Sequence, residues 1–161
     1  MTSAVMALGF VVTASAATTY AGTLREQKVA GPYRLMLVIG PAQNMSEMGS
    51  EMTVGGKAAT CRTTGKGMTS SAPMHAPTCN RHVELHVFDA HTNKVLLAAR
   101  VGITLRDAKN HMAISVPIME MMAGSNLRDF HYGNNIHAAP GQYTIKVTVN
   151  AVHATFAVKL K

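Results

Sequence analysis

The sequence predicts an all-β fold, an antiparallel β-sandwich of the immunoglobulin type with about seven to eight short strands. Three observations lead to this expectation. Apolar and polar residues alternate with a period of two in segments such as 82–89 and 143–149, as in half-buried strands. Turn residues such as Pro140-Gly141 separate these segments, and no long segment repeats apolar residues at helical spacing. A closed barrel is the alternative architecture.

The N-terminal half offers one clear strand. Residues 33–41 are an apolar run that ends at Gly40-Pro41. Residues 42–81 lack a period and are rich in Gly, Ser, Thr, Ala and Met, so we expect a long loop with a short strand near 52–54. A loop of this length inside a compact domain is usually functional or disordered.

The C-terminal half is expected to be almost continuous β-structure. After a turn at Thr92-Asn93, residues 94–105 form one long or broken strand. A turn at Asn150-Ala151 then makes a final hairpin. The expected strands of this half are 82–89, 94–105, 111–118, 143–149 and 153–160.

Length and composition fit one domain with one core, because the 161 residues are 47% hydrophobic and only 14% charged. An apolar stretch, 6–12, precedes Ala14-Ser15-Ala16, which fits the cleavage site of a secretory signal although no Lys or Arg comes before the stretch. An apolar tail or a first strand is the alternative. We expect a signal-peptide-like leader at 1–17, a linker at 18–30 and a single β-sandwich domain at 31–161 with a Met-rich loop at 42–81.

The two cysteines, Cys61 and Cys79, are expected to form a disulfide, as an even pair in an exported protein most often does. Closing this loop stabilises the fold by roughly 3 kcal/mol in the loop-entropy model. Thiolate metal ligands are the alternative, which no C-x-x-C spacing supports.

The formal net charge of +7 comes from scattered basic residues without a run of five. Nucleic-acid binding needs Lys and Arg clustered with aromatic residues on one face, so no nucleic-acid partner is expected. The sequence also lacks a nucleophile elbow, a Walker loop, a dinucleotide fingerprint and an H-E-x-x-H helix, so an enzyme is not expected.

Imidazole, carboxylate and thioether groups instead predict a metal site. His82, Glu84 and His86 share one face of a strand, about 6.6 Å apart, so a single ion needs further ligands from a neighbouring strand. Met119 and Met121 share a face of the segment 118–122. This ligand set suits copper first, and iron or zinc less exclusively. An ordinary exposed strand face and methionines packed in the core are the alternatives.

Two further segments contain additional residues of the types that bind metal ions. Met45, Met48 and Met52 lie among Ser, Gly and Glu, unlike a core segment. The segment 129–137 carries His131 and His137, and we expect residues 132–135 to form a tight turn that presents His131.

Residues 80–150 resemble the periplasmic Fe²⁺ transport-associated family. His82 and Glu84 match its His-x-Glu pair, Met121 matches its ligand methionine with Met119 as the alternative register, and His131 matches the histidine before Tyr-Gly. Gly141-Gln142-Tyr143 matches its C-terminal strand. A further histidine of the family is replaced by Thr148, and His86, His137 or His153 could substitute for it.

The resemblance implies an exported, immunoglobulin-like periplasmic protein that binds copper and assists iron uptake. It also implies a homodimer beside an inner-membrane permease. The expected metal ligands are His82, Glu84, Met121 and His131, for copper (Cu⁺ or Cu²⁺), iron or zinc. Because imidazole binds metal only when neutral, binding is expected to weaken below about pH 6. The competing hypothesis is a metal-free interaction module whose Met-rich loop contacts a permease or another exported partner.

Overall fold

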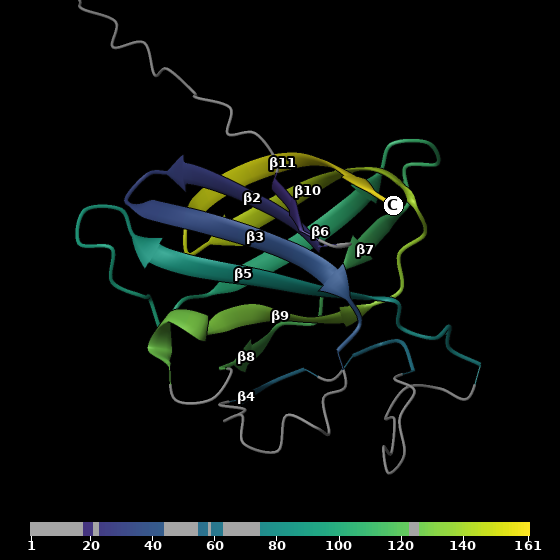
Figure 1. The fold of residues 1–161 in the computed structure, drawn as a ribbon, viewed down its shortest axis with the longest axis horizontal. Coiled ribbons are helices and arrows are strands. Elements are labelled where there is room, and N and C mark those ends of the chain that lie inside the picture. The colour runs from purple at the N-terminus through teal and green to yellow at the C-terminus, as the bar shows by residue number, and fades with distance from the viewer. Residues whose placement is uncertain (1–17, 21–22, 44–54, 58, 63–74, 123–125) are drawn as a thin grey trace, which may run out of the picture.

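The computed structural model describes residues 18–20, 23–43, 55–57, 59–62, 75–122 and 126–161. These residues form eleven strands and one short 3₁₀ helix (Figure 1). The elements are β1 (Thr18–Tyr20), β2 (Thr23–Ala30), β3 (Tyr33–Pro41), β4 (Gly55–Gly56), β5 (Arg81–Asp89), β6 (Val101–Asp107), β7 (Ala113–Ser115), β8 (Met119–Met121), η1 (Leu127–Asp129), β9 (His131–Ile136), β10 (Gly141–Val149) and β11 (Val152–Leu160).

The strands form two antiparallel sheets, so the predicted all-β sandwich is confirmed. The larger sheet has the order β1-β2-β3-β5-β9-β8-β4, and the smaller has the order β11-β10-β6-β7. Figure 1 shows the smaller sheet crossing behind the larger one. The strand count exceeds the prediction for two reasons. β1, β4 and β8 have only two or three residues each, too short for their alternation to be read from the sequence, and β2 and β9 lie in segments expected to be a linker and a turn.

The core lies between the two sheets and follows the period-two pattern. In β10 the inward residues Tyr143, Ile145, Val147 and Val149 are buried, while the residues between them are partly or fully exposed. Each strand therefore supplies every second side chain to a common apolar layer, whose removal from water is the main stabilising contribution to such a fold.

Tyr132 of β9 connects this core to the loop before β6. Its hydroxyl donates to Leu96 O at 2.9 Å and accepts from Ala99 N at 3.1 Å. The ring is fully buried, and burial, followed by the charge of Glu120, raises the pKa of Tyr132 to about 12. The phenol therefore stays neutral and holds both backbone groups.

Three expectations about local structure are wrong. The linker predicted at 18–30 is instead β1 and β2, because pairing of β2 with β3 stabilises a segment whose own pattern is weak. Residues 94–100 are irregular apart from a bridge between Val95 and Phe88, and the strand begins only at Val101. Residues 132–135 are the middle of β9 and form no turn, because β5 pairs with all four of them and β8 pairs with Tyr132 and Gly133 on the other side.

The predicted disulfide is present. Cys61 and Cys79 are bonded, with their Cα atoms 5.1 Å apart. Arg62 and Thr78 form a bridge beside the disulfide, and Cys61 Sγ lies 3.6 Å from Asn135 O at the end of β9. The disulfide therefore fixes part of the long 42–81 loop against a strand that carries candidate ligands.

Two predicted segments, the leader at 1–17 and the methionines Met45, Met48 and Met52, lie outside the described residues. Within the described part of the chain, no helix has the length and apolar character needed to cross a membrane.

Candidate metal centre

Strand β5 presents its polar residues on the outer face of the larger sheet. Val83, Leu85 and Val87 point into the core, so His82, Glu84 and His86 point the other way, as the alternation predicts. This outer face is not open, because His82 is 0% exposed and His86 is 7% exposed. The three side chains therefore lie in a covered polar layer and are not an ordinary solvated face.

Strand β9 brings the second set of ligands beside β5. Because Tyr132 points into the core, His131 faces outward, and His82 pairs with Asn135 while Glu84 pairs with Gly133. A Cβ atom on Gly133 would lie 1.8 Å from Val83 O. Only glycine lets the two strands approach this closely.

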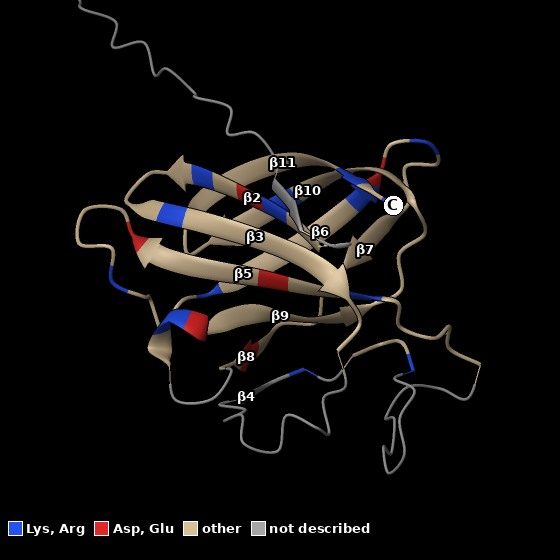
Figure 2. Ribbon diagram, viewed as in Figure 1, with Lys and Arg blue, Asp and Glu red and all other residues tan. Residues whose placement is uncertain are grey.

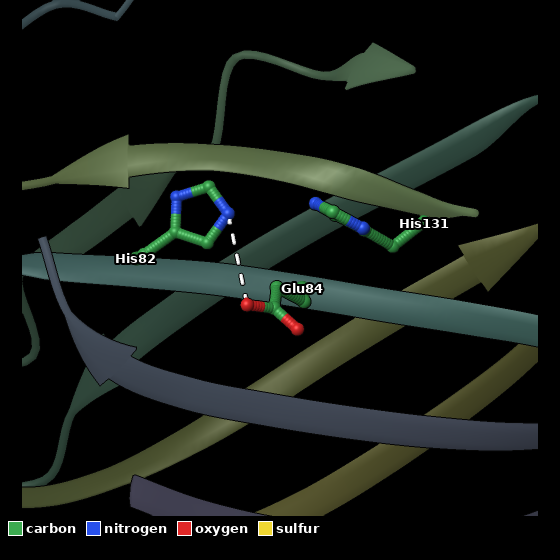
Figure 3. A group of neighbouring side chains, drawn as sticks. All are labelled: His82, Glu84 and His131. Atoms are coloured by element: carbon green, nitrogen blue, oxygen red, sulfur yellow. Dashed lines mark ion pairs between the residues drawn. The ribbon is translucent and has the colours of Figure 1, made fainter. Parts of the chain in front are cut away.

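One ligand atom from each of His82, Glu84 and His131 falls within 4.8 Å of the other two. Figure 3 shows the two imidazoles and the carboxylate facing one another from β5 and β9. His82 Nε2 lies 3.9 Å from Glu84 Oε1. The three predicted ligands, separated by up to 49 positions in the sequence, therefore converge on one small volume.

The backbone and one amide fix the tautomers of both imidazoles. His131 Nδ1 lies 2.8 Å from Asp129 O, and His82 Nδ1 lies 2.9 Å from Asn135 Oδ1. Asn135 Nδ2 donates to Gln43 O, which identifies Oδ1 as the acceptor end of this amide. Since both oxygens only accept, each Nδ1 carries the hydrogen and each Nε2 carries a free lone pair.

These two Nε2 atoms are the unusual feature of the site. Both are buried, and neither has a hydrogen-bond partner among the described residues. Leaving a buried polar atom unpaired costs about 1–3 kcal/mol. Two free lone pairs beside a carboxylate form a suitable ligand set for a metal ion. Buried polar atoms without a hydrogen-bond partner are otherwise rare in protein cores.

The charges around Glu84 indicate the same chemistry. Its partners on the neighbouring strands, Val38 and Gly133, are uncharged, and its ion-pair contacts within the described residues are with His82 and His86. Figure 2 shows an acidic segment in the middle of β5, with basic residues spread over other strands and loops. Among the residues that the structure describes, no Lys or Arg forms an ion pair with this partly buried carboxylate.

Burial governs the ionisation of the imidazoles. It lowers the pKa of His82 and of His131 below 6.5, although the nearby Glu84 acts to raise both. Burial alone would raise the pKa of Glu84, but the hydrogen bond from His86 and the charges of the three histidines outweigh it and lower that pKa. The group is therefore set to hold neutral imidazoles beside an ionised carboxylate.

The methionine predicted as a ligand lies on the next strand. Met121 of β8 pairs directly with His131 and is 2% exposed, and Met119 pairs with Gly133. Directly paired residues of an antiparallel sheet point to the same side. Both methionines therefore belong to the outer face that carries the imidazoles, with Met121 beside His131.

The three histidines considered as substitutes have different positions. His86 Nε2 lies 3.4 Å from Glu84 Oε2, so His86 belongs to the cluster. His137 is exposed, with Nδ1 2.7 Å from Thr78 O. His153 is exposed on the smaller sheet, with Nδ1 3.2 Å from the hydroxyl of Thr148.

Sequence reasoning missed Gln43, Gly133 and Asn135 as parts of the site. Gln43 donates to Glu84 Oε1 and its backbone NH donates to Asn135 Oδ1. These contacts span 41 and 92 positions in the chain. Gly133, Asn134 and Asn135 are typical turn residues in the sequence, so the local pattern did not indicate these contacts.

Fold and site together define a β-sandwich protein with a candidate metal centre on the outer face of its larger sheet. No family model and no curated protein matches the chain. A solved structure with a similar fold is the copper-bound glutamate-to-glutamine variant of FetP from uropathogenic Escherichia coli strain F11, with a TM-score of 0.57 and 13% identity over 84% of this chain and 93% of that chain. At this identity the likeness shows a shared fold, which is the fold that the resemblance to the Fe²⁺ transport-associated family implies.

Proposed function

We propose that this chain is an exported, periplasmic metal-binding protein that binds copper through His82, Glu84 and His131, with Met121 beside them. The observation that carries the proposal is the pair of buried Nε2 lone pairs, each fixed by a hydrogen bond at Nδ1 and each close to the Glu84 carboxylate. A cation at their centre would satisfy both lone pairs and neutralise the carboxylate.

The donor types favour copper over hard ions. Imidazole suits copper, zinc and iron, whereas a thioether favours Cu⁺. The similar FetP structure is copper-bound, which supports the same preference here. Iron and zinc bind the same nitrogen and oxygen donors and rank after copper in this proposal.

The cellular role follows from export and from the family resemblance. A disulfide persists in an oxidising compartment, which supports a periplasmic location. Metal uptake beside an inner-membrane permease, with the protein as a homodimer, is the role that the resemblance implies.

Metal binding by tag-free protein tests the proposal directly. The purified protein should bind close to one Cu²⁺ per chain, and the double variant His82→Ala, His131→Ala should lose this binding. His153→Ala removes an exposed histidine from the other sheet and serves as the matched control. Native protein that binds no metal, or a double variant with native affinity, would reject the metal centre and favour the metal-free interaction module.

A further inference from the structure

A hollow lies at one end of the sandwich, between the connection that follows β5 and the short helix η1. Its volume is about 450 Å³, and its walls include Lys94, Val95 and Leu97 from the connection and Leu127 and Arg128 from η1. Binding sites for small molecules usually have volumes of about 300–1,000 Å³ and combine apolar walls with a few polar groups. The hollow therefore has the size of a small-molecule site.

Two exposed leucines line this hollow. Leu97 is 45% exposed and Leu127 is 55% exposed, and they are two of the four large hydrophobic side chains that are exposed among the described residues. Val95, which packs against the core, continues the apolar wall between them and the sandwich. Single exposed apolar side chains are common on protein surfaces, whereas apolar side chains gathered at one place mark binding sites.

The polar part of the hollow is positively charged. Lys94 and Arg128 line it, and neither forms an ion pair within the part of the chain that the structure describes. Asp89, at the end of β5, accepts hydrogen bonds from the backbone of His91 and Thr92 and from the Thr92 hydroxyl, so its carboxylate is engaged in its own turn. Figure 2 shows basic segments on both η1 and the connection after β5. The hollow therefore complements an anionic group.

Both walls are held in place by the protein itself. The Tyr132 hydroxyl bonds to Leu96 O and Ala99 N, which fixes the backbone on either side of Leu97. In η1 the Asn126 side chain accepts from Arg128 N at 3.1 Å, and the helix leads directly into β9. A site whose walls are already ordered loses less conformational entropy when a ligand binds.

We propose that this hollow binds an amphiphilic carboxylate, a small molecule with a carboxylate at one end of an aliphatic chain, as in a fatty acid of medium length. The aliphatic chain packs against Leu97 and Leu127. The carboxylate is bound by Arg128, whose planar guanidinium matches it with two parallel hydrogen bonds, and by the charge of Lys94. This site is separate from the candidate metal centre, because none of the expected metal ligands lines the hollow.

Sodium octanoate is the probe that tests this site. Titrated into isotope-labelled protein below its micelle-forming concentration, it should shift the backbone nuclear magnetic resonance signals of residues 94–97 and 127–128 in a saturable way. Acetate lacks the aliphatic chain and octan-1-ol lacks the charge. Each should bind at least about 10-fold more weakly than octanoate, because each loses one of the two contributions to binding.

Three substitutions of exposed residues locate the site. Arg128→Glu should weaken octanoate binding at least about 10-fold, because it replaces a charge-assisted hydrogen bond with repulsion. Leu127→Ser should also weaken it, by removing part of the apolar wall. Lys146→Glu, on the outer face of β10, changes the net charge as much as Arg128→Glu and should bind octanoate as the native protein does. Thermal unfolding should show that all three variants keep the native fold.

Four results would overturn the inference. The first is the absence of saturable octanoate binding, and the second is equal binding of acetate, which would leave only a patch that attracts anions. The third is an equal loss in Lys146→Glu, which would show attraction by net charge alone. The fourth is binding to phosphatidylglycerol vesicles without binding of free octanoate, which would assign the exposed leucines to a membrane surface.

Discussion

Two outer faces of the sandwich share one sequence pattern and differ in their surroundings. On β5 the outward residues His82 and His86 are buried beneath other parts of the chain. On β10 and β11 the outward residues Lys146 and His153 are exposed. Alternation alone therefore identifies a strand and its faces, whereas a site appears only where distant segments cover one face. On β5 the contacts to this face include Gln43 and the His131 ring from the neighbouring strand β9.

The largest difference between the two faces should appear in the free energy of unfolding when one glycine on each face is replaced by alanine. Gly133→Ala places a Cβ against Val83 O, so β9 must move away from β5, and the free energy of unfolding should fall by about 3 kcal/mol. Gly102→Ala, on the exposed face, meets only Thr148 Cβ at 3.9 Å and should change stability little. Urea unfolding measures both. Equal effects of the two variants would show that the close approach of β5 and β9 has no special role.

The covered face should also depend on its hydrogen bonds, with a smaller effect. Asn135→Leu removes the acceptor for His82 Nδ1, so the imidazole loses its fixed orientation and Cu²⁺ affinity should fall about 10–100-fold. Asn135→Asp keeps an oxygen acceptor and should retain most of the affinity. Calorimetric titration compares the two variants. Native binding by Asn135→Leu would mean that the orientation of His82 does not depend on this amide.

The smallest expected effect is a pH dependence of the metal-free protein. The unfolded chain protonates its histidines near pH 6.5, but burial lowers the pKa of His82 and His131 in the folded state. The unfolded state therefore binds more protons as pH falls below 6.5, and the free energy of unfolding decreases through that range. Glu84, whose folded pKa lies below 4.5, continues the loss at lower pH.

Unfolding measurements across this pH range test the sign. Native protein should lose stability as pH falls from 6.5, and His131→Gln should show a shallower slope. A native protein that gains stability on acidification would contradict the burial of neutral imidazoles. The same shifts place the loss of metal binding at a lower pH than an exposed histidine would give, below the value of about pH 6 expected from ordinary imidazole.

The sequence was sufficient for the faces of β5, because period-two alternation is a local property. The choice of His82, Glu84 and His131 as ligands came from the family resemblance, and alternation did not identify β9 as a strand. Gln43 and Gly133 could not be predicted in the same way, since their roles exist only after β3, β5 and β9 pair. The 18–30 segment illustrates the same limit. Its residues are mostly half-exposed, and β2 is defined by its hydrogen bonds to β3 rather than by a strong apolar pattern.

Strand β9 is buried on both sides along its whole length, and this has a consequence for how the chain finds its native pairing. His131 faces the candidate metal centre, and the adjacent Tyr132 faces the core. A slip of one residue would exchange these faces, placing an imidazole among apolar side chains and a phenol among the ligands. The environments on the two faces of β9 therefore both constrain its register. The candidate metal centre and the core together favour a single register of β9.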